Sequence, residues 1–268
     1  MKKRLKLSMR LNKVDYDPVK DHKTYSYQDI CAYTKDMLAL PVNVYQPRVE
    51  NEYNKIAVVC IHGGAWQSDL KKGQKWQGSW MKHNASILAD IGFYAVEITH
   101  RSIAETSISE IIYDVISAFN YVNRVIRERD RIEKLYAIGD SAGGHLALMS
   151  AYFEDVKVEK IVVCNPVTDL TDPKWQLGTT TPDERRNASP IFMKDKTDAQ
   201  IYLLHGDADR TVPLEYSVNL QKHFADLGIK CELEILEGAA HAFILHGYKT
   251  HKDRVNEYME KVIDIFTR

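Results

Sequence analysis

The chain has 268 residues, of which 44% are hydrophobic and 27% are charged. This length is enough to bury a large core, and the average polarity is too high for a protein embedded in a membrane. The 36 Lys and Arg residues nearly balance the 37 Asp and Glu residues, which leaves a formal net charge of −1. No overall electric field therefore attracts nucleic acid or anionic lipid. The expected partner is a small neutral molecule, and a homodimer is left open.

The N-terminal residues 1–11 are basic, as in the first part of a secretory signal. Asn12, Lys13 and Asp15 follow at once, where a secretory signal needs an apolar stretch. No later segment approaches the roughly 20 apolar residues of a membrane span. The four cysteines lie far apart in the sequence, which favours free thiols over a disulfide framework. We therefore predict a cytoplasmic protein.

Short apolar runs alternate with longer stretches of helical period along the chain. This alternation is typical of an α/β protein with a mostly parallel sheet and helices on both faces. Residues 1–30 are predicted to form an N-terminal arm, either packed over the sheet or paired as an antiparallel edge hairpin. The predicted strands are residues 40–45, 56–61, 93–99, 135–138, 159–164, 201–204 and 231–236. The predicted helices are residues 111–122, 146–153, 216–227 and 248–266.

Residues 165–198 interrupt the alternation between two predicted strands. They are rich in proline, carry mixed charges and show little periodicity. Long irregular connections in compact domains tend to be lids or binding loops. This segment is therefore predicted to be a short lid-like insertion. Because no domain boundary is evident elsewhere, we expect residues 1–268 to form a single domain.

A small-residue pentapeptide, GDSAG at 139–143, lies between a predicted strand and a predicted helix. In a strand, sharp turn and helix, the central serine is held in a strained conformation above the carboxyl edge of the sheet. The glycines on either side let the strand and the helix approach closely. Such pentapeptides also arise by chance, but this context favours Ser141 as a nucleophile.

Two polar loops after later strands supply the partners that such a serine needs. A serine hydroxyl is a weak nucleophile at neutral pH, so it requires a general base and a group that orients the base. The loop at 205–213 contains Asp207 and Asp209, and the loop at 238–243 contains His241. We predict that Asp209 orients His241 and that Asp207 orders its own loop. The order Ser, Asp, His along the chain agrees with this architecture.

Two other histidines near these loops have simpler interpretations. His205 is expected to be a buried, hydrogen-bonded residue at a strand end, and His246 a surface residue before a helix. The chain has no His-Glu-x-x-His or Cys-x-x-Cys pattern. We therefore expect neither a metal nor another cofactor.

Backbone donors for a negatively charged oxygen are expected in the segment HGGAW at 62–66, which follows a predicted strand. Its small residues leave amide groups free to face an oxyanion. We predict that amides of this segment and the amide of Ala142 form an oxyanion hole, with a plain Gly-Gly turn as the alternative for the segment. Trp66 and Trp175 are expected near the substrate, with packing in the core as their alternative.

The segments HGGAW, GDSAGGH, HGDADRTVP and GAAHAF, in this order, resemble the α/β-hydrolase fold. They are similar to its branch of carboxylesterases with an HGG-type oxyanion motif, over roughly residues 35–268. The resemblance implies that Ser141 is the nucleophile, Asp209 the acid and His241 the base. It also implies that Gly64, Ala65 and Ala142 are the oxyanion donors, with the register among residues 63–65 left open by the sequence. The end of the insertion and the segment around Asp114 resemble acetyl-xylan and feruloyl esterase-like enzymes, while HGGAW also resembles the arylformamidases.

The expected activity is a serine carboxylic-ester hydrolase that acts on short-chain acyl esters through an acyl-enzyme. The resemblance suggests acetylated or feruloylated carbohydrate as the substrate. One alternative keeps the three residues and changes the bond, giving an arylformamidase that hydrolyses N-formylkynurenine or a small peptidase. A protein that only binds a ligand on the same fold is the third hypothesis.

Overall fold

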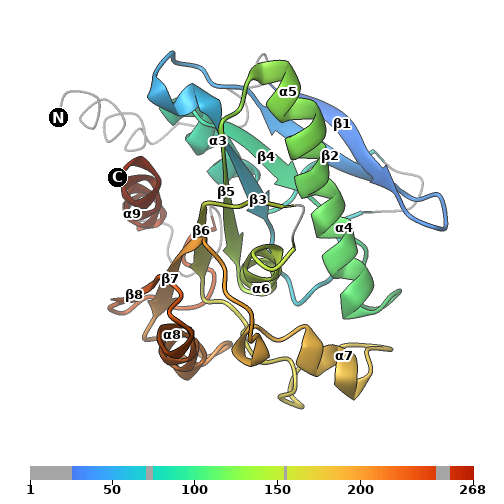
Figure 1. Ribbon diagram of the computed structural model, residues 1–268, viewed down its shortest axis with the longest axis vertical. Coiled ribbons are helices and arrows are strands. Elements are labelled where there is room, and N and C mark those ends of the chain that lie inside the picture. The colour runs from blue at the N-terminus through green and yellow to red at the C-terminus, as the bar shows by residue number, and fades with distance from the viewer. Residues whose placement is uncertain (1–25, 71–74, 154–155, 246–253) are drawn as a thin grey trace.

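A single sheet organises the computed structural model, which describes residues 26–70, 75–153, 156–245 and 254–268 (Figure 1). Eight strands lie in the order β1-β2-β4-β3-β5-β6-β7-β8. Strands β1 and β2 pair antiparallel to their neighbours, and the other pairs are parallel. The strands are β1 Ser26–Tyr33, β2 Ala39–Tyr45, β3 Ile56–Ile61, β4 Tyr94–Ile98, β5 Lys134–Asp140, β6 Lys160–Cys164, β7 Gln200–Gly206 and β8 Cys231–Leu236.

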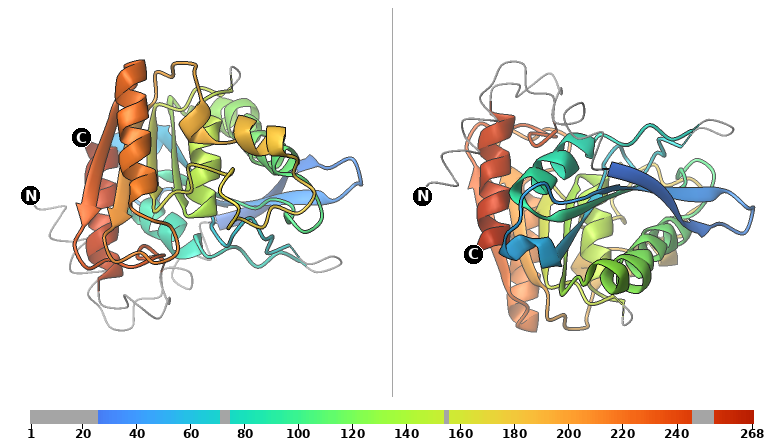
Figure 2. Two further views of the ribbon diagram at one scale, coloured as in Figure 1. Left: turned by 90° about the horizontal axis from the view of Figure 1, so that it is seen from below. Right: turned by 90° about the horizontal axis from the view of Figure 1, so that it is seen from above.

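Helices cover both faces of this sheet. Figure 2 shows α3 and α9 on one side and α4, α6 and α8 on the other. Each side has its own apolar core, and the two cores are separated by the sheet. The helices are α3 Lys82–Ile91, α4 Ile108–Tyr121, α5 Arg127–Asp130, α6 Ala142–Ser150, α7 Pro182–Asn187, α8 Glu215–Leu227 and α9 Val255–Thr267.

The central strands are buried on both sides, which explains their continuous apolar sequences. All six residues of β3, with the sequence IAVVCI, are buried, and so are all five residues of β6. Parallel strands covered by helices on both faces have this composition because neither face meets water. The edge strand β8 instead alternates, with the sequence CELEIL. The parallel register brings the carboxyl ends of β3, β5, β7 and β8 to one edge of the sheet.

The predicted strands and most predicted helices agree with these elements. The predicted arm falls mostly outside the described residues, but residues 26–30 belong to β1, which pairs with β2 as an edge hairpin. Of the predicted helix at 248–266, residues 248–253 lie outside the described residues, and α9 begins at Val255. Helix α3 was not predicted from the sequence.

The predicted insertion at 165–198 joins β6 to β7 and contains the short helix α7. It is fastened to the body of the protein rather than projecting from it. Inside the insertion, Ser189 is fully buried and accepts a hydrogen bond from the Leu170 amide (2.8 Å). The Ala188 carbonyl contacts His145 Nε2 of α6 (2.7 Å), which ties the insertion to the body. Leu177 is also buried. The insertion therefore forms a fixed wall beside α6.

All four cysteines are free thiols. Every helix in the described part of the chain is too short or too polar to cross a lipid bilayer. The cytoplasmic location stays a prediction.

Candidate active site

Ser141 occupies the sharp turn between β5 and α6. Its backbone angles, φ 55° and ψ −119°, lie in a region that a residue with a side chain rarely adopts. Close packing around the turn enforces this conformation. A Cβ atom added to Gly139 would come within 2.2 Å of the Gly143 carbonyl oxygen, and one on Gly143 within 2.2 Å of the Ile61 carbonyl oxygen. The turn therefore has the geometry of a nucleophile elbow.

His241 and Asp209 complete a continuous hydrogen-bonded chain with Ser141. The Nε2 atom of His241 lies 3.0 Å from the Ser141 Oγ, and its Nδ1 atom lies 2.6 Å from Asp209 Oδ2. The other oxygen of Asp209 accepts hydrogen bonds from the amides of Thr211 (2.7 Å) and Val212 (3.0 Å). These bonds fix the carboxylate, whose side chain is fully buried. The arrangement has the geometry of a serine hydrolase triad.

The groups around His241 favour the charged form of its imidazole. Burial by itself lowers the pKa of His241, but the hydrogen bond to Asp209 and the nearby charges of Asp140 and Asp209 raise it above its usual value. Burial by itself raises the pKa of Asp209, but the hydrogen bond and charge of His241 and the two loop amides bring it below its usual value. An imidazolium formed during proton transfer is therefore stabilised where it forms.

The neighbouring polar residues of these loops have structural contacts. Asp207 Oδ1 accepts a hydrogen bond from the Gly238 amide (2.7 Å), so it ties the two loops together. His205 is fully buried and contacts the Ser217 hydroxyl (2.7 Å) and the Val212 carbonyl (3.0 Å). These contacts agree with the predictions for Asp207 and His205, and His246 lies outside the described residues.

The segment after β3 lies directly beside the serine. A Cβ atom added to Gly63 would come within 3.1 Å of the Ser141 Cβ. Gly64 and Ala65 both have positive φ angles, 99° and 52°, which turn the chain sharply at this point. The amide of Ala142 belongs to the first turn of α6, where helical amides have no partner within the helix. Within the described residues, the amides of Gly64, Ala65 and Ala142 have no hydrogen-bond acceptor.

Two stacked histidines pack next to the segment 62–66 that follows β3. The His62 and His100 rings are stacked with centroids 4.6 Å apart, and both side chains are buried. Burial lowers the pKa of His100 to about 3, so its ring is neutral. The next residue, Arg101, makes a bidentate ion pair with Asp114, with contacts of 2.9 and 2.8 Å. These contacts anchor the chain behind the candidate oxyanion hole.

The two tryptophans expected near the substrate differ in exposure. Trp66 is 1% exposed, and its indole N–H donates a hydrogen bond to His145 Nδ1 (3.1 Å). This burial does not support direct contact of Trp66 with a substrate. Trp175 is half-buried, packs edge-on against Trp66 with centroids 5.8 Å apart, and donates to the Tyr216 hydroxyl (3.2 Å). Trp175 therefore stays a predicted pocket residue.

Asp140 and Trp80 are two neighbours of the site that sequence reasoning missed. Asp140 is 1% exposed, and its Oδ1 atom has no hydrogen-bond partner. Burial raises its pKa to about 7. Trp80 is 59% exposed and lies against Gly64. The position of Asp140 next to Ser141 was a usable signal, whereas no sequence pattern relates Trp80 to the oxyanion segment.

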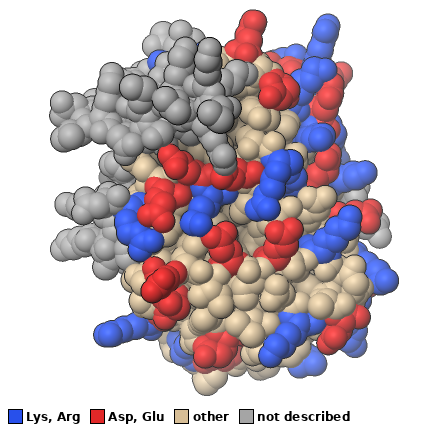
Figure 3. Space-filling model, turned by 90° about the vertical axis from the view of Figure 1, so that its left-hand side faces the viewer, with Lys and Arg blue, Asp and Glu red and all other residues tan. Residues whose placement is uncertain are grey.

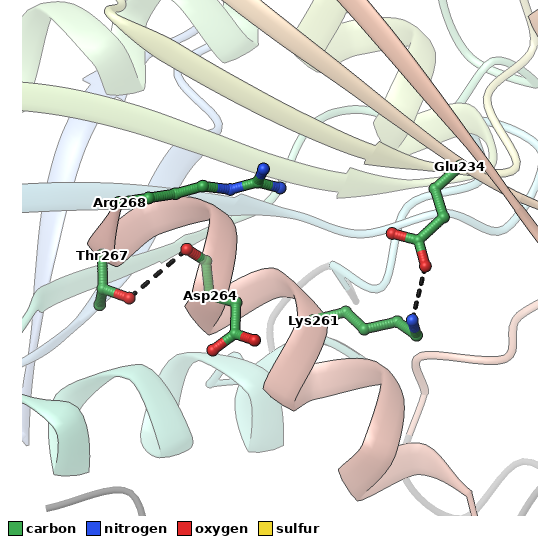
Figure 4. Close-up of a pocket in the computed structure, with 5 residues that line it drawn as sticks. All are labelled: Glu234, Lys261, Asp264, Thr267 and Arg268. Carbon is green, nitrogen blue, oxygen red and sulfur yellow. Dashed lines mark hydrogen bonds and ion pairs between the residues drawn. The ribbon is translucent and has the colours of Figure 1, made fainter. Parts of the chain in front are cut away.

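A surface hollow of about 480 Å³ lies away from these residues, between β8 and α9 (Figure 4). Its lining is polar and consists of Glu234, Lys261, Asp264, Thr267 and Arg268. On the face shown in Figure 3, basic and acidic side chains are interspersed rather than gathered by sign. Among the described residues, no cluster of three or more His, Cys, Asp or Glu side chains is arranged to hold a metal ion.

Comparison with known families agrees with this geometry. The family model described as BD-FAE matches residues 42–224, which is more than half of the chain. The chain belongs to the BD-FAE family. BD-FAE is an α/β-hydrolase-type esterase family, so this member is a serine hydrolase of the carboxylesterase type. No curated protein matches the chain.

Solved structures of an esterase share the fold of this BD-FAE member. The propionate-bound form of esterase 2 from the Planctomycetes species Thermogutta terrifontis is 22% identical, covers 90% of this chain and 93% of its own, and has a TM-score of 0.74. The form phosphoramylated by tabun and the butyrate-bound form are each 23% identical to this chain, and each match covers 90% of this chain and 93% of the esterase. Their TM-scores are 0.74 and 0.72. These likenesses support the α/β-hydrolase fold predicted from the sequence.

Proposed function

We propose that this BD-FAE member hydrolyses short-chain acyl esters through an acyl-enzyme on Ser141. The observation that carries the proposal is the unbroken chain of contacts from Asp209 through His241 to Ser141, at 2.6 and 3.0 Å. Three segments that are distant in sequence contribute one alcohol, one imidazole and one carboxylate. Each lies at the carboxyl edge of the sheet, where this fold carries its chemistry.

The proposed reaction begins with proton transfer from the Ser141 hydroxyl to His241 Nε2 as the oxygen attacks the ester carbonyl carbon. The carbonyl oxygen becomes negative and accepts hydrogen bonds from the amides of Gly64, Ala65 and Ala142. Each such donor contributes about 3 kcal/mol to stabilising the transition state. His241 then returns the proton to the departing alcohol, and the acyl group stays on Ser141.

Water completes the cycle by hydrolysing the acyl-enzyme. His241 removes a proton from the water as its oxygen attacks the acyl-enzyme, and then returns that proton to the Ser141 oxygen. Asp209 remains ionised throughout and holds the Nδ1–H tautomer of the imidazole. The pKa directions of Asp209 and His241 support these roles, because the pair favours a charged carboxylate beside a charged ring.

The packing of the insertion supports a short acyl group. The buried bonds of Ser189 and the two hydrogen bonds from Arg185 Nη1 to the Leu170 and Trp175 carbonyls (3.3 and 3.1 Å) fix the wall that Trp175 belongs to. A fixed wall leaves little opportunity to admit a long chain. The propionate and butyrate named for the Thermogutta esterase forms are also short acids. Acetylated or feruloylated carbohydrate remains the substrate class proposed from the resemblance.

Hydrolysis of p-nitrophenyl esters of graded chain length tests this proposal. We expect kcat/KM to be highest between acetate and butyrate and to fall steadily beyond. A preference for acyl chains longer than about eight carbons contradicts the short pocket. N-formylkynurenine should be included as a competing substrate, because faster hydrolysis of that amide than of any ester would replace the ester hydrolase with an arylformamidase.

A further inference from the structure

Trp80 is an exposed indole between two buried neighbours. It is 59% exposed, whereas Ser79 is 2% exposed and Met81 is fully buried. The other three tryptophans, Trp66, Trp76 and Trp175, are buried or half-buried. Exposing an indole forgoes the large stabilisation that its burial provides, and it leaves the ring of Trp80 open to a ligand.

A buried carboxylate fixes the turn that presents Trp80. Glu97 on β4 is fully buried and accepts hydrogen bonds from the Ser79 amide and the Ser79 hydroxyl, the latter at 2.6 Å. The same carboxylate accepts from Asn43 Nδ2 (2.9 Å) and the Tyr45 hydroxyl (3.0 Å). These four donors satisfy a buried acid that would otherwise be costly. The backbone next to Trp80 is therefore anchored to strands β2 and β4.

The ring of Trp80 lies next to the candidate oxyanion segment. A Cβ atom added to Gly64 would come within 3.3 Å of Trp80 Cζ3 and 3.6 Å of Cη2, so the outer edge of the six-membered ring lies next to this glycine. Gly63, the preceding residue, is packed against the Ser141 Cβ. Two residues of backbone therefore separate the indole from the serine.

The indole also lies on the side of the site to which His241 belongs. Trp80 lies two residues before α3. Asn84 in the first turn of that helix donates a hydrogen bond to the Ile244 carbonyl (3.0 Å), three residues after His241. Met81, Ala242 and Ile244 share the core under α3 and α9, while Trp66 and Trp175 pack in the core on the other face. Trp80 and the Trp66–Trp175 pair therefore lie on opposite faces of the sheet, at its carboxyl edge.

We propose that Trp80 is a specificity-determining residue that stacks on a ring in the alcohol half of the ester. The inference rests on the proposed function, because in that mechanism His241 gives its proton to the departing alcohol and so must lie on the alcohol side. An exposed indole on an anchored turn can stack on a flat apolar ring face, which both an aromatic ring and the C–H face of a pyranose present. The insertion wall with Trp175 is left to the acyl half.

The test compares three acetate esters with similar alkyl leaving groups. Benzyl acetate carries an aromatic ring, an acetylated methyl xyloside carries a pyranose, and ethyl acetate carries no ring. For Trp80→Ala we expect KM to rise and kcat/KM to fall about 3- to 10-fold for a ring-bearing ester, and to stay within 2-fold for ethyl acetate. Trp80→Phe should recover most of the loss because it restores a flat ring.

The outcomes separate this inference from the proposed function. A loss confined to benzyl acetate assigns the platform to aromatic alcohols, and a loss confined to the xyloside assigns it to sugars. An equal loss on all three esters overturns the proposal, because Trp80 then only supports the oxyanion segment, and so does the absence of any change. Tyr113→Ala, which removes another exposed aromatic ring on α4, is the matched control. If wild-type protein fails to cleave even ethyl acetate, it is the proposed function that fails.

Discussion

His241 Nε2 lies 3.0 Å from the Ser141 Oγ, although the two residues are 100 positions apart in the sequence. The contact exists because β5 and β8 run parallel in one sheet and end at the same edge. The side chains are held from different directions, Ser141 by the strained turn and His241 by Asp209. Because these two restraints are independent, substitutions can remove them separately and measure what each contributes to activity.

Replacing Asp209 and Asp207 separately distinguishes orientation of the base from ordering of the loop. Asp209→Asn should lower kcat about 10³- to 10⁴-fold, because the amide no longer holds the correct tautomer of His241. Asp207→Asn removes only an acceptor for the Gly238 amide and should lower kcat by no more than a few-fold. Steady-state kinetics on p-nitrophenyl acetate measures both. Equal losses in the two variants would show that the acid of the triad is wrongly assigned.

Replacing Asp140 should change the pH dependence of activity. His241 must be neutral to accept the serine proton, so kcat/KM falls as the pH drops through its pKa. Burial lowers this pKa, while the hydrogen bond to Asp209 and the charges of Asp140 and Asp209 raise it above the usual value. Asp140→Asn removes one of the raising charges, so the acid limb of the kcat/KM profile should move to lower pH. An unmoved limb, or one moved to higher pH, excludes coupling between these groups.

The same substitution should have a pH-dependent effect on stability. Burial raises the pKa of Asp140 from 3.8 to about 7. Between these pH values the folded chain binds more protons than the unfolded chain, so the stability contributed by this group falls as the pH rises. Asp140→Asn has no such proton to lose, and its Tm relative to wild type should therefore be higher at pH 8 than at pH 5. If the Tm difference between Asp140→Asn and wild type is the same at both pH values, the raised pKa of Asp140 is contradicted.

Loosening the insertion should broaden acyl-chain selectivity. Ser189→Ala removes the acceptor of the buried Leu170 amide and should destabilise the segment by about 1–3 kcal/mol. Limited proteolysis within 165–198 should become faster, and kcat/KM for octanoate relative to acetate should rise. Thr171→Ala, on an exposed part of the same insertion, is the control. If proteolysis accelerates while the chain-length profile stays the same, the insertion does not limit the acyl pocket.

Much of the fold was predictable because its signals are local. The central strands β3 and β6 are continuous apolar runs, and their burial on both faces is the reason. Helix α3 escaped prediction because Asn84, Ser86 and Asp90 are buried polar residues that obscure its apolar face. The edge strand β1 is polar and partly exposed, so its sequence resembles that of a surface arm.

The candidate site was predictable wherever function requires a particular side chain in a particular place along the fold. Ser141, Asp209 and His241 each follow a strand, so strand order brought them together before any coordinates were known. The contacts of Trp66 and Trp80 depend instead on how loops pack in three dimensions. HGGAW gave no indication that the Trp66 ring would turn inward to His145 while Trp80, fourteen residues later, would lie next to Gly64.

Covalent labelling tests the central claim most directly. The wild-type protein treated with a fluorophosphonate should gain one adduct per chain by intact mass spectrometry, and peptide mapping should locate it on Ser141. Ser141→Ala should remain unlabelled and inactive, with an unchanged circular dichroism spectrum. An adduct on any other residue, or equal labelling of the Ser141→Ala variant, would contradict the account.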